Sequence, residues 1–118
     1  MKSKKSRLIV SKGTTMFTLK IEDIACIYRD KLIVIVVDKN EHRFLYNKNL
    51  SDLETELDPA LFFRANRQYL ININFIKNYT IIDRVKLAVR LTLPSNRHQV
   101  IISQETAPLF KKWIRDEN

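Results

Sequence analysis

The stretch FFRANRQYLIN, residues 62–72, has two apolar ends and a polar centre. The apolar segments at and just beyond its ends, residues 62–65 and 69–73, are rich in aromatic and β-branched side chains, which favour strands. The central residues 66–68 are typical of a turn, because Asn readily adopts turn backbone conformations. Strands joined by so short a turn pair in antiparallel fashion. The stretch therefore predicts a β-hairpin and a fold rich in antiparallel strands.

Further apolar segments extend this pattern in both directions along the chain. Residues 32–37 are six consecutive apolar residues, most of them β-branched, and predict a central strand buried on both faces. Residues 17–21 alternate apolar and polar side chains, which is typical of a half-buried strand. Other short strands are expected at residues 24–28, 42–46, 76–82, 86–93 and 98–102.

One helix is predicted in the middle of the chain. Ser51 and Glu54 have the spacing of a capping box, with Ser51 as the N-cap. Pro59 is expected to end the helix, because proline disfavours helical backbone in the residue before it. One side of this helix would be apolar, through Leu50, Leu53 and Leu57.

A second, short helix is predicted near the end of the chain. Thr106 could cap it, and the apolar pairs Leu109/Trp113 and Phe110/Ile114 have helical i, i+4 spacing. The fold class predicted from these patterns is mainly β, with short antiparallel strands, one mid-domain helix and a short C-terminal helix.

The length of 118 residues suits one compact domain. Residues 1–7 hold four basic residues and no acidic one, and we expect residues 1–13 to form a basic arm or linker. Residues 14–118 would then form the domain.

The charge is strongly basic and unevenly distributed. The formal net charge is +8, and residues 59–103 carry seven Lys and Arg against a single acidic residue. Basic side chains in turns and on outward strand faces indicate a surface for phosphates. A solvated basic surface without a partner remains an alternative at this point.

Composition argues against several other classes of protein. A single glycine, Gly13, excludes a Gly-rich phosphate loop, and the lone Cys26 excludes an internal disulfide and fits a reducing cytoplasm. Two His and one Cys make a structural zinc site improbable, and no nucleophile–base pair indicates an enzyme. No apolar run is long enough to span a bilayer. We therefore expect a cytoplasmic protein without catalytic residues, metal or cofactor.

The polar turn at residues 64–68 sharpens the interpretation of the charge. Arg can form a bidentate contact with guanine, and Asn or Gln can do so with adenine. The turn holds two Arg, one Asn and one Gln within five residues. These side chains suit base edges and phosphate oxygens, although a hairpin tip selected for turn propensity would also be polar.

The same stretch resembles the signature of the LytTR family of DNA-binding domains, an aromatic residue and an Arg, a short polar turn, then an aromatic residue and an Asn. Residues 21–28 look like the early strand pair of the family, and residues 49–57 look like its mid-domain helix. Ile76 follows Asn72 at the family's spacing, and residues 100–103 resemble its last strand. The resemblance covers about residues 12–110.

The resemblance implies an all-β core with an elongated arrangement of sheets, whose loops enter successive major grooves of double-stranded DNA. It implies a bacterial transcription regulator, usually the output domain of a two-component response regulator. The base-reading candidates are Lys31, Asn66, Arg67 and Gln104. The phosphate-contacting candidates are Arg29, Arg64, Gln68 and Lys77.

This sequence departs from the family pattern at two places. Asn66 stands where many members have His, and Gln104-Glu105 stands where a basic residue is common.

A homodimer on direct-repeat sites is expected to form through a receiver domain outside these 118 residues. The alternatives are a basic β domain that binds RNA through exposed aromatic side chains, and a protein-interaction module for an acidic partner. The phenylalanines Phe17, Phe44, Phe62, Phe63 and Phe75 lie in apolar segments and are expected in the core.

Overall fold

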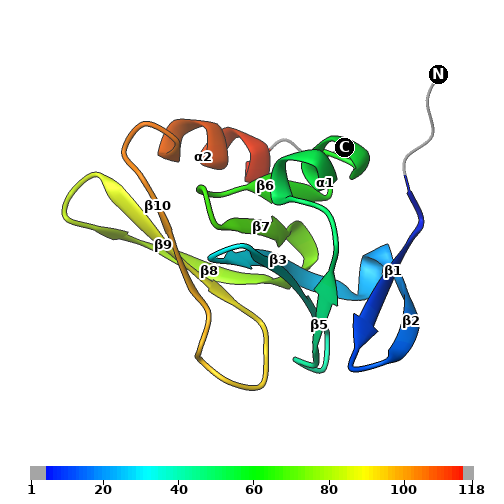
Figure 1. Cartoon of the computed structure of the whole chain (residues 1–118). Helices are drawn as coiled ribbons and strands as arrows, with labels where there is room; N and C mark the ends of the chain where they lie inside the picture. The colour runs from blue at the N-terminus through cyan, green and yellow to red at the C-terminus, as the bar shows by residue number, and fades with distance from the viewer. Residues whose placement is uncertain (1–4, 116–118) are drawn as a thin grey trace.

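The computed structural model describes residues 5–115 as ten β-strands, two α-helices and two short 3-10 helices (Figure 1). A seven-stranded sheet has the order β2-β1-β5-β4-β3-β7-β6, and a three-stranded sheet has the order β10-β9-β8. All recorded strand pairs are antiparallel, so the predicted fold class is confirmed. The first sheet contains β1 (Arg7–Lys12), β2 (Thr15–Lys20), β3 (Ile24–Asp30), β4 (Ile33–Asp38), β5 (Arg43–Tyr46), β6 (Phe62–Arg64) and β7 (Tyr69–Asn72). The second contains β8 (Ile76–Ile82), β9 (Lys86–Leu91) and β10 (Gln99–Ile102).

The strand β4 lies in the middle of the large sheet, as its β-branched sequence predicts. Val34, Val36 and Val37 are buried. The expectation that residues 32–37 are buried throughout is wrong at their start, because Leu32 lies in the β3–β4 turn and is 97% exposed. The periodicity of an apolar run does not show where the turn before it ends.

The predicted arm over residues 1–13 is wrong from residue 7 onward. Residues 7–12 form β1, which pairs with β2 from Arg7↔Lys20 to Lys12↔Thr15. Leu8 and Val10 are buried in the core, so this strand is part of the folded sheet. Residues 1–4 of the predicted arm lie outside the described residues.

The strand β2 is at the edge of the large sheet and is more exposed than its alternating sequence predicts. Phe17, expected in the core, is 38% exposed and packs its ring edge-on against Phe44, with centroids 5.1 Å apart. An edge strand has a neighbour on one side alone, so its apolar side chains cannot all be covered.

The mid-domain helix α1 (Leu50–Glu56) has a different N-cap from the predicted one. The side chain of Asn49, not Ser51, accepts a hydrogen bond from the backbone N–H of Asp52, at 2.7 Å. With Asn49 as the N-cap, the helix begins two residues earlier than a cap at Ser51 would place it. The side chain of Glu54 then takes no part in a capping box and is available for another partner. The apolar side of the helix is buried as expected, through Leu50, Leu53 and Leu57.

Two clusters of apolar side chains make up the core. One joins α1 to one face of the large sheet, and the other joins β3, β4 and β7 to the small sheet and to α2 (Ala107–Arg115). The signature residue Asn72 is fully buried, and its amide donates to the carbonyl of Ile24 at 2.8 Å. This bond joins the end of β7 to the start of β3. No helix in residues 5–115 is long and apolar enough to cross a membrane.

Candidate nucleic-acid interface

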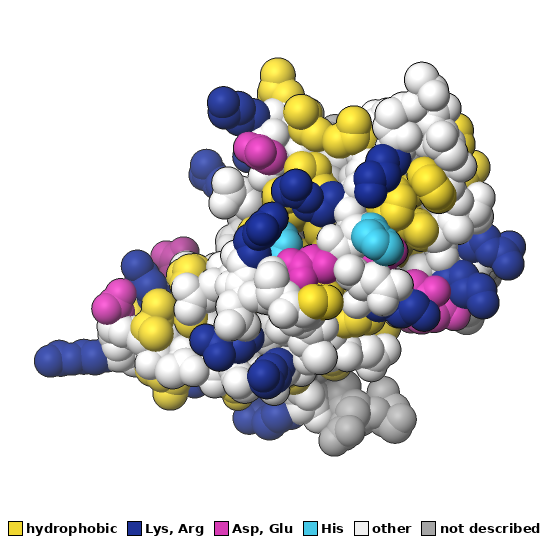
Figure 2. Space-filling model, turned by 90° about the horizontal axis from the view of Figure 1, so that it is seen from below, with side chains coloured by type: hydrophobic (Ala, Val, Ile, Leu, Met, Phe, Trp, Pro, Cys, Tyr) yellow, Lys and Arg dark blue, Asp and Glu magenta, His cyan; other side chains and the backbone are white. Residues whose placement is uncertain are grey.

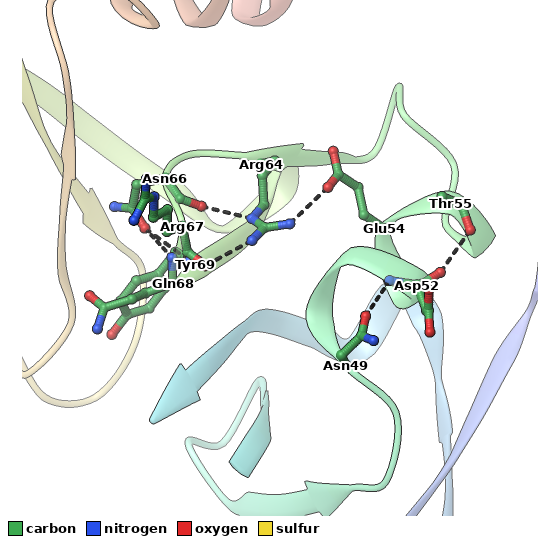
Figure 3. A network of polar contacts seen from close by, with 9 residues as sticks. All are labelled: Asn49, Asp52, Glu54, Thr55, Arg64, Asn66, Arg67, Gln68 and Tyr69. Carbon is green, nitrogen blue, oxygen red and sulfur yellow. Dashed lines mark hydrogen bonds and ion pairs between the residues drawn. The ribbon is translucent and has the colours of Figure 1, made fainter. Parts of the chain in front are cut away.

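The side chain of Arg64 holds the loop between β6 and β7, residues 65–68 (Figure 3). The Nε of Arg64 donates to the carbonyl of Asn66 at 2.7 Å, and its Nη2 donates to the carbonyl of Arg67 at 2.8 Å. Its Nη1 forms an ion pair with Oε1 of Glu54 on α1, at 2.9 Å. The side chain of Arg64 is 23% exposed. The guanidinium therefore fixes the path of the loop instead of projecting from it.

Asn66 holds the same loop from within. Its side-chain oxygen accepts from the backbone N–H groups of Gln68 and Tyr69, at 2.8 and 3.0 Å. Its amide group donates to the carbonyl of Ile101 on β10, at 2.8 Å. Asn66 thus closes the turn and also ties it to the small sheet.

An aromatic cluster supports the end of this loop. The Tyr69 ring stacks on Tyr28 at a centroid distance of 5.3 Å, and its hydroxyl lies 2.9 Å from Nδ1 of His98. His98 is 6% exposed, and its burial lowers the pKa of the imidazole below the ordinary value of 6.5. Burial likewise raises the pKa of the Tyr69 hydroxyl. Tyr69 and His98 are therefore neutral near pH 7, and their contacts serve to position the loop.

Arg67 and Gln68 are the exposed residues of the loop. Within residues 5–115, no hydrogen bond or ion pair is recorded for either side chain. Their backbones are fixed by Arg64 and Asn66. The loop thus presents two long, multi-donor side chains from a rigid base.

The β3–β4 turn lies beside this loop. The backbone N–H of Arg29 donates to the carbonyl of Gln68 at 2.9 Å. Arg29 and Lys31 are exposed, and Lys31 has a positive φ of 58°. The first two predicted recognition segments are therefore adjacent.

The turn between β10 and α2 flanks the loop on its other side. A groove of about 490 Å³ is lined by Arg64, Ala65, Asn66, Arg67, Ser103 and Thr106. Gln104 and Glu105 are exposed in the same turn. The Ser103 carbonyl accepts from the N–H of Ala107 at 2.9 Å, so the turn leads directly into α2. Three predicted segments thus form one continuous surface, 29–31, 64–68 and 103–106.

Lys77 is the predicted contact residue that stands apart. It is exposed at the beginning of β8, an edge strand of the small sheet. No hydrogen bond or ion pair recorded in the described part of the chain joins it to the three segments.

Sequence reasoning missed the positioning roles in this surface. Glu54 has the spacing of a capping-box residue, yet it is the ion-pair partner of Arg64. His98 lies in a predicted strand, and no local pattern indicates that it meets Tyr69 from a different sheet. These contacts join residues 10 and 29 positions apart, which no local periodicity shows.

Basic side chains extend beyond the three segments. Figure 2 shows the molecule from below the view of Figure 1, with Lys and Arg spread over this face and fewer Asp and Glu among them. Arg43 and Arg97 line one small hollow together with Glu41, whose carboxylate accepts hydrogen bonds from the backbone and side chain of Ser95. The Ser95 bonds hold the pKa of Glu41 below its ordinary value, so the carboxylate is charged at pH 7. The positive electrostatic potential therefore extends over the surface of the domain beyond the three loop segments.

The single cysteine, Cys26, is buried in the core. Burial raises the pKa of the Cys26 thiol to about 12, so the thiolate is not formed at neutral pH. No group of three or more His, Cys, Asp or Glu in this range could hold a metal ion.

Comparison with known proteins shows the family of this chain. The family model of the LytTr DNA-binding domain matches residues 14–115. Among solved structures, the chain is similar to the LytTr DNA-binding domain of a putative methyl-accepting/DNA response regulator from Bacillus cereus. The TM-score is 0.82 at 19% sequence identity, over 93% of this chain and 97% of that chain. No curated protein matches the chain. The match over residues 14–115 shows that the chain belongs to the LytTR family of DNA-binding domains.

Proposed function

We propose that this domain binds double-stranded DNA sequence-specifically and regulates transcription in a bacterium. The observation that supports it most directly is the continuous surface of three loops, in which the side chain of Arg67 has no recorded partner within residues 5–115 and stands on a rigidly held turn. A fixed backbone with long donor side chains suits base edges in the major groove. The net charge of +8 provides attraction to phosphates along the duplex.

The proposal assigns different roles to the predicted contact residues. Lys31, Arg67 and Gln104 read bases, one from each loop. Arg29, Gln68 and Lys77 contact phosphates, which position the protein without carrying sequence information. Arg64 and Asn66, which the sequence places among the contact residues, position the loop, because their polar groups are bonded inside the protein.

The setting we propose is that of a response regulator in the cytoplasm, where DNA is the partner. The solved relative is described as part of such a regulator. We further propose that two copies bind direct-repeat sites and that dimerisation depends on a receiver domain. Binding, without catalysis or a cofactor, is the proposed activity.

The test is selection from a random duplex library followed by titration of the selected duplex at several salt concentrations. The three loops and Lys77 present about 3–6 phosphate contacts, so the plot of log K against log salt should have a slope of about −0.9 per contact. A mutated duplex with the same length should bind more weakly at every salt concentration. Failure to enrich any sequence, together with a flat salt dependence, would refute the proposal.

The same titration separates the alternatives. An RNA-binding domain would favour single-stranded RNA over duplex DNA of equal length. A module for acidic proteins would bind polyglutamate as tightly as the selected duplex at equal ionic strength. Preference for the selected DNA duplex over both competitors is the expected result.

A further inference from the structure

Leu32 is the most exposed large apolar side chain among residues 5–115. It is 97% exposed at the tip of the β3–β4 turn, and Ile33 beside it is 51% exposed. A leucine in this position contributes almost nothing to the hydrophobic core, since nearly all of its surface stays in water. Folding stability therefore does not explain the presence of Leu32 at this position.

The backbone of this turn is also unfavourable for its sequence. Asp30 pairs with Ile33, so that Lys31 and Leu32 alone form the turn. Lys31 has a φ of 58°, a left-handed conformation in which Gly, Asn or Asp is usual. The same left-handed backbone occurs at Glu41, Asp83 and Arg84, which also lie in turns between strands. The strained turn keeps Lys31 and Leu32 together at the end of the hairpin.

The turn belongs to the candidate interface. The bond from the Arg29 N–H to the Gln68 carbonyl places the end of β3 against the loop that carries Arg67. Leu32 and Ile33 therefore place apolar groups on a surface where Arg67 and Gln68, the exposed residues of the neighbouring loop, are polar.

In duplex DNA, one base carries an apolar group on the edge that faces the major groove. Thymine presents its C5-methyl group there, and an apolar side chain recognises it by contact. The polar donors of Lys31 and Arg67 cannot distinguish this methyl group from hydrogen. We infer that Leu32 contacts the C5-methyl group of a thymine and so determines sequence preference at that base pair; this inference rests on the proposed function.

The test replaces each thymine of the selected duplex, one at a time, by deoxyuridine, which lacks only the methyl group. For the unaltered protein, replacement at one or two neighbouring positions should weaken binding about three- to fivefold, the effect of one methyl group leaving an apolar contact. Leu32→Ala should bind the parent duplex more weakly and lose the difference between thymine and deoxyuridine at those positions. Leu32→Met, which keeps an apolar side chain of similar length, should retain the difference.

Ile9→Ala is the matched control, because Ile9 is 63% exposed on β1, three strands away from β3 in the large sheet. It should keep the full deoxyuridine effect. Thermal unfolding should be unchanged in Leu32→Ala, which shows that any loss of binding does not come from unfolding.

Three results would overturn the inference. They are a selected site without thymine, no deoxyuridine effect at any position, or an effect that persists in Leu32→Ala. Each of these leaves specific duplex binding intact and so is distinguishable from failure of the proposed function, in which no duplex is selected at all.

Discussion

The β6–β7 loop and the β3–β4 turn lie side by side in the candidate interface, yet they are built in different ways. Side chains hold the first, through the three donors of Arg64 and the amide of Asn66. The second is a two-residue turn shaped by its own backbone, with Lys31 at positive φ. In the β6–β7 loop, some residues hold the backbone and others are exposed. In the β3–β4 turn, the residues that form the turn are themselves the exposed ones.

This difference determines what a substitution can do. In the β6–β7 loop, removing a positioning residue should lower stability and weaken all DNA contacts together. In the β3–β4 turn, removing an exposed side chain should change contacts and leave folding intact. Substitutions in the two segments can therefore test whether positioning and reading are truly separate in this domain.

The largest effect is expected for Arg64→Ala. The substitution removes three hydrogen bonds and leaves the carbonyls of Asn66 and Arg67 without their charged donor. We expect the free energy of unfolding to fall by about 2–3 kcal/mol, with duplex affinity lowered at least tenfold. Chemical denaturation and anisotropy titration measure the two quantities.

Glu54→Gln is the control for the ion pair, since it leaves the two carbonyl contacts in place. Because Glu54 is 44% exposed, its loss should cost less than about 1 kcal/mol. Unchanged stability in Arg64→Ala, with a salt slope shallower by about 0.9, would instead identify Arg64 as a phosphate contact.

A smaller effect is expected for Asn66→Ala. The turn loses two acceptor bonds and its link to Ile101, and stability should fall by about 1–2 kcal/mol. Affinity should fall by the same factor for every single-base variant of the selected site, because the whole loop shifts. Relaxed preference at one base pair alone would show that Asn66 reads a base, as the resemblance implied.

The smallest effect concerns His98 under the same loop. Its pKa is lowered by burial, so the folded protein binds the proton less tightly than the unfolded chain does. Stability should be highest above pH 6.5 and decrease as the pH falls below that value. His98→Gln should reduce this decrease between pH 7.5 and 5.5 in denaturation experiments. A decrease in stability that is just as large in His98→Gln as in the unaltered protein would contradict the assignment to His98.

Local sequence patterns predicted the places of most strands and of both helices. The hairpin at residues 62–72 and the strand at 76–82 are observed at the predicted places. The pattern fails at Leu8-Ile9-Val10, because three apolar residues after a basic segment are too few to indicate a strand. In the structure these residues belong to β1, which pairs with β2. The pattern also misplaced the N-cap, because Asn49 and Ser51 are both good caps.

The segments of the candidate interface could be predicted from the sequence. Which of their residues position a loop and which are exposed could not. The polar turn at 64–68 indicated donors that suit DNA, and its exposed residues are still the proposed contacts. The sequence did not show that Arg64 and Asn66 point inward, because their partners Glu54 and Ile101 are 10 and 35 residues away. The sequence pattern places Leu32 in a buried strand. In the structure Leu32 lies in the β3–β4 turn before that strand, and it is therefore exposed.

Arg67→Ala tests the central claim most directly, that a rigidly held loop presents a base-reading arginine. Its backbone bond to Arg64 does not depend on the side chain, so thermal unfolding should be unchanged. Affinity for the selected duplex should fall by about 1–3 kcal/mol, and across a panel of single-base variants the preference at one base pair should relax. A preference profile identical to that of the unaltered protein would contradict the account, since Arg67 would then contact phosphates or nothing at all.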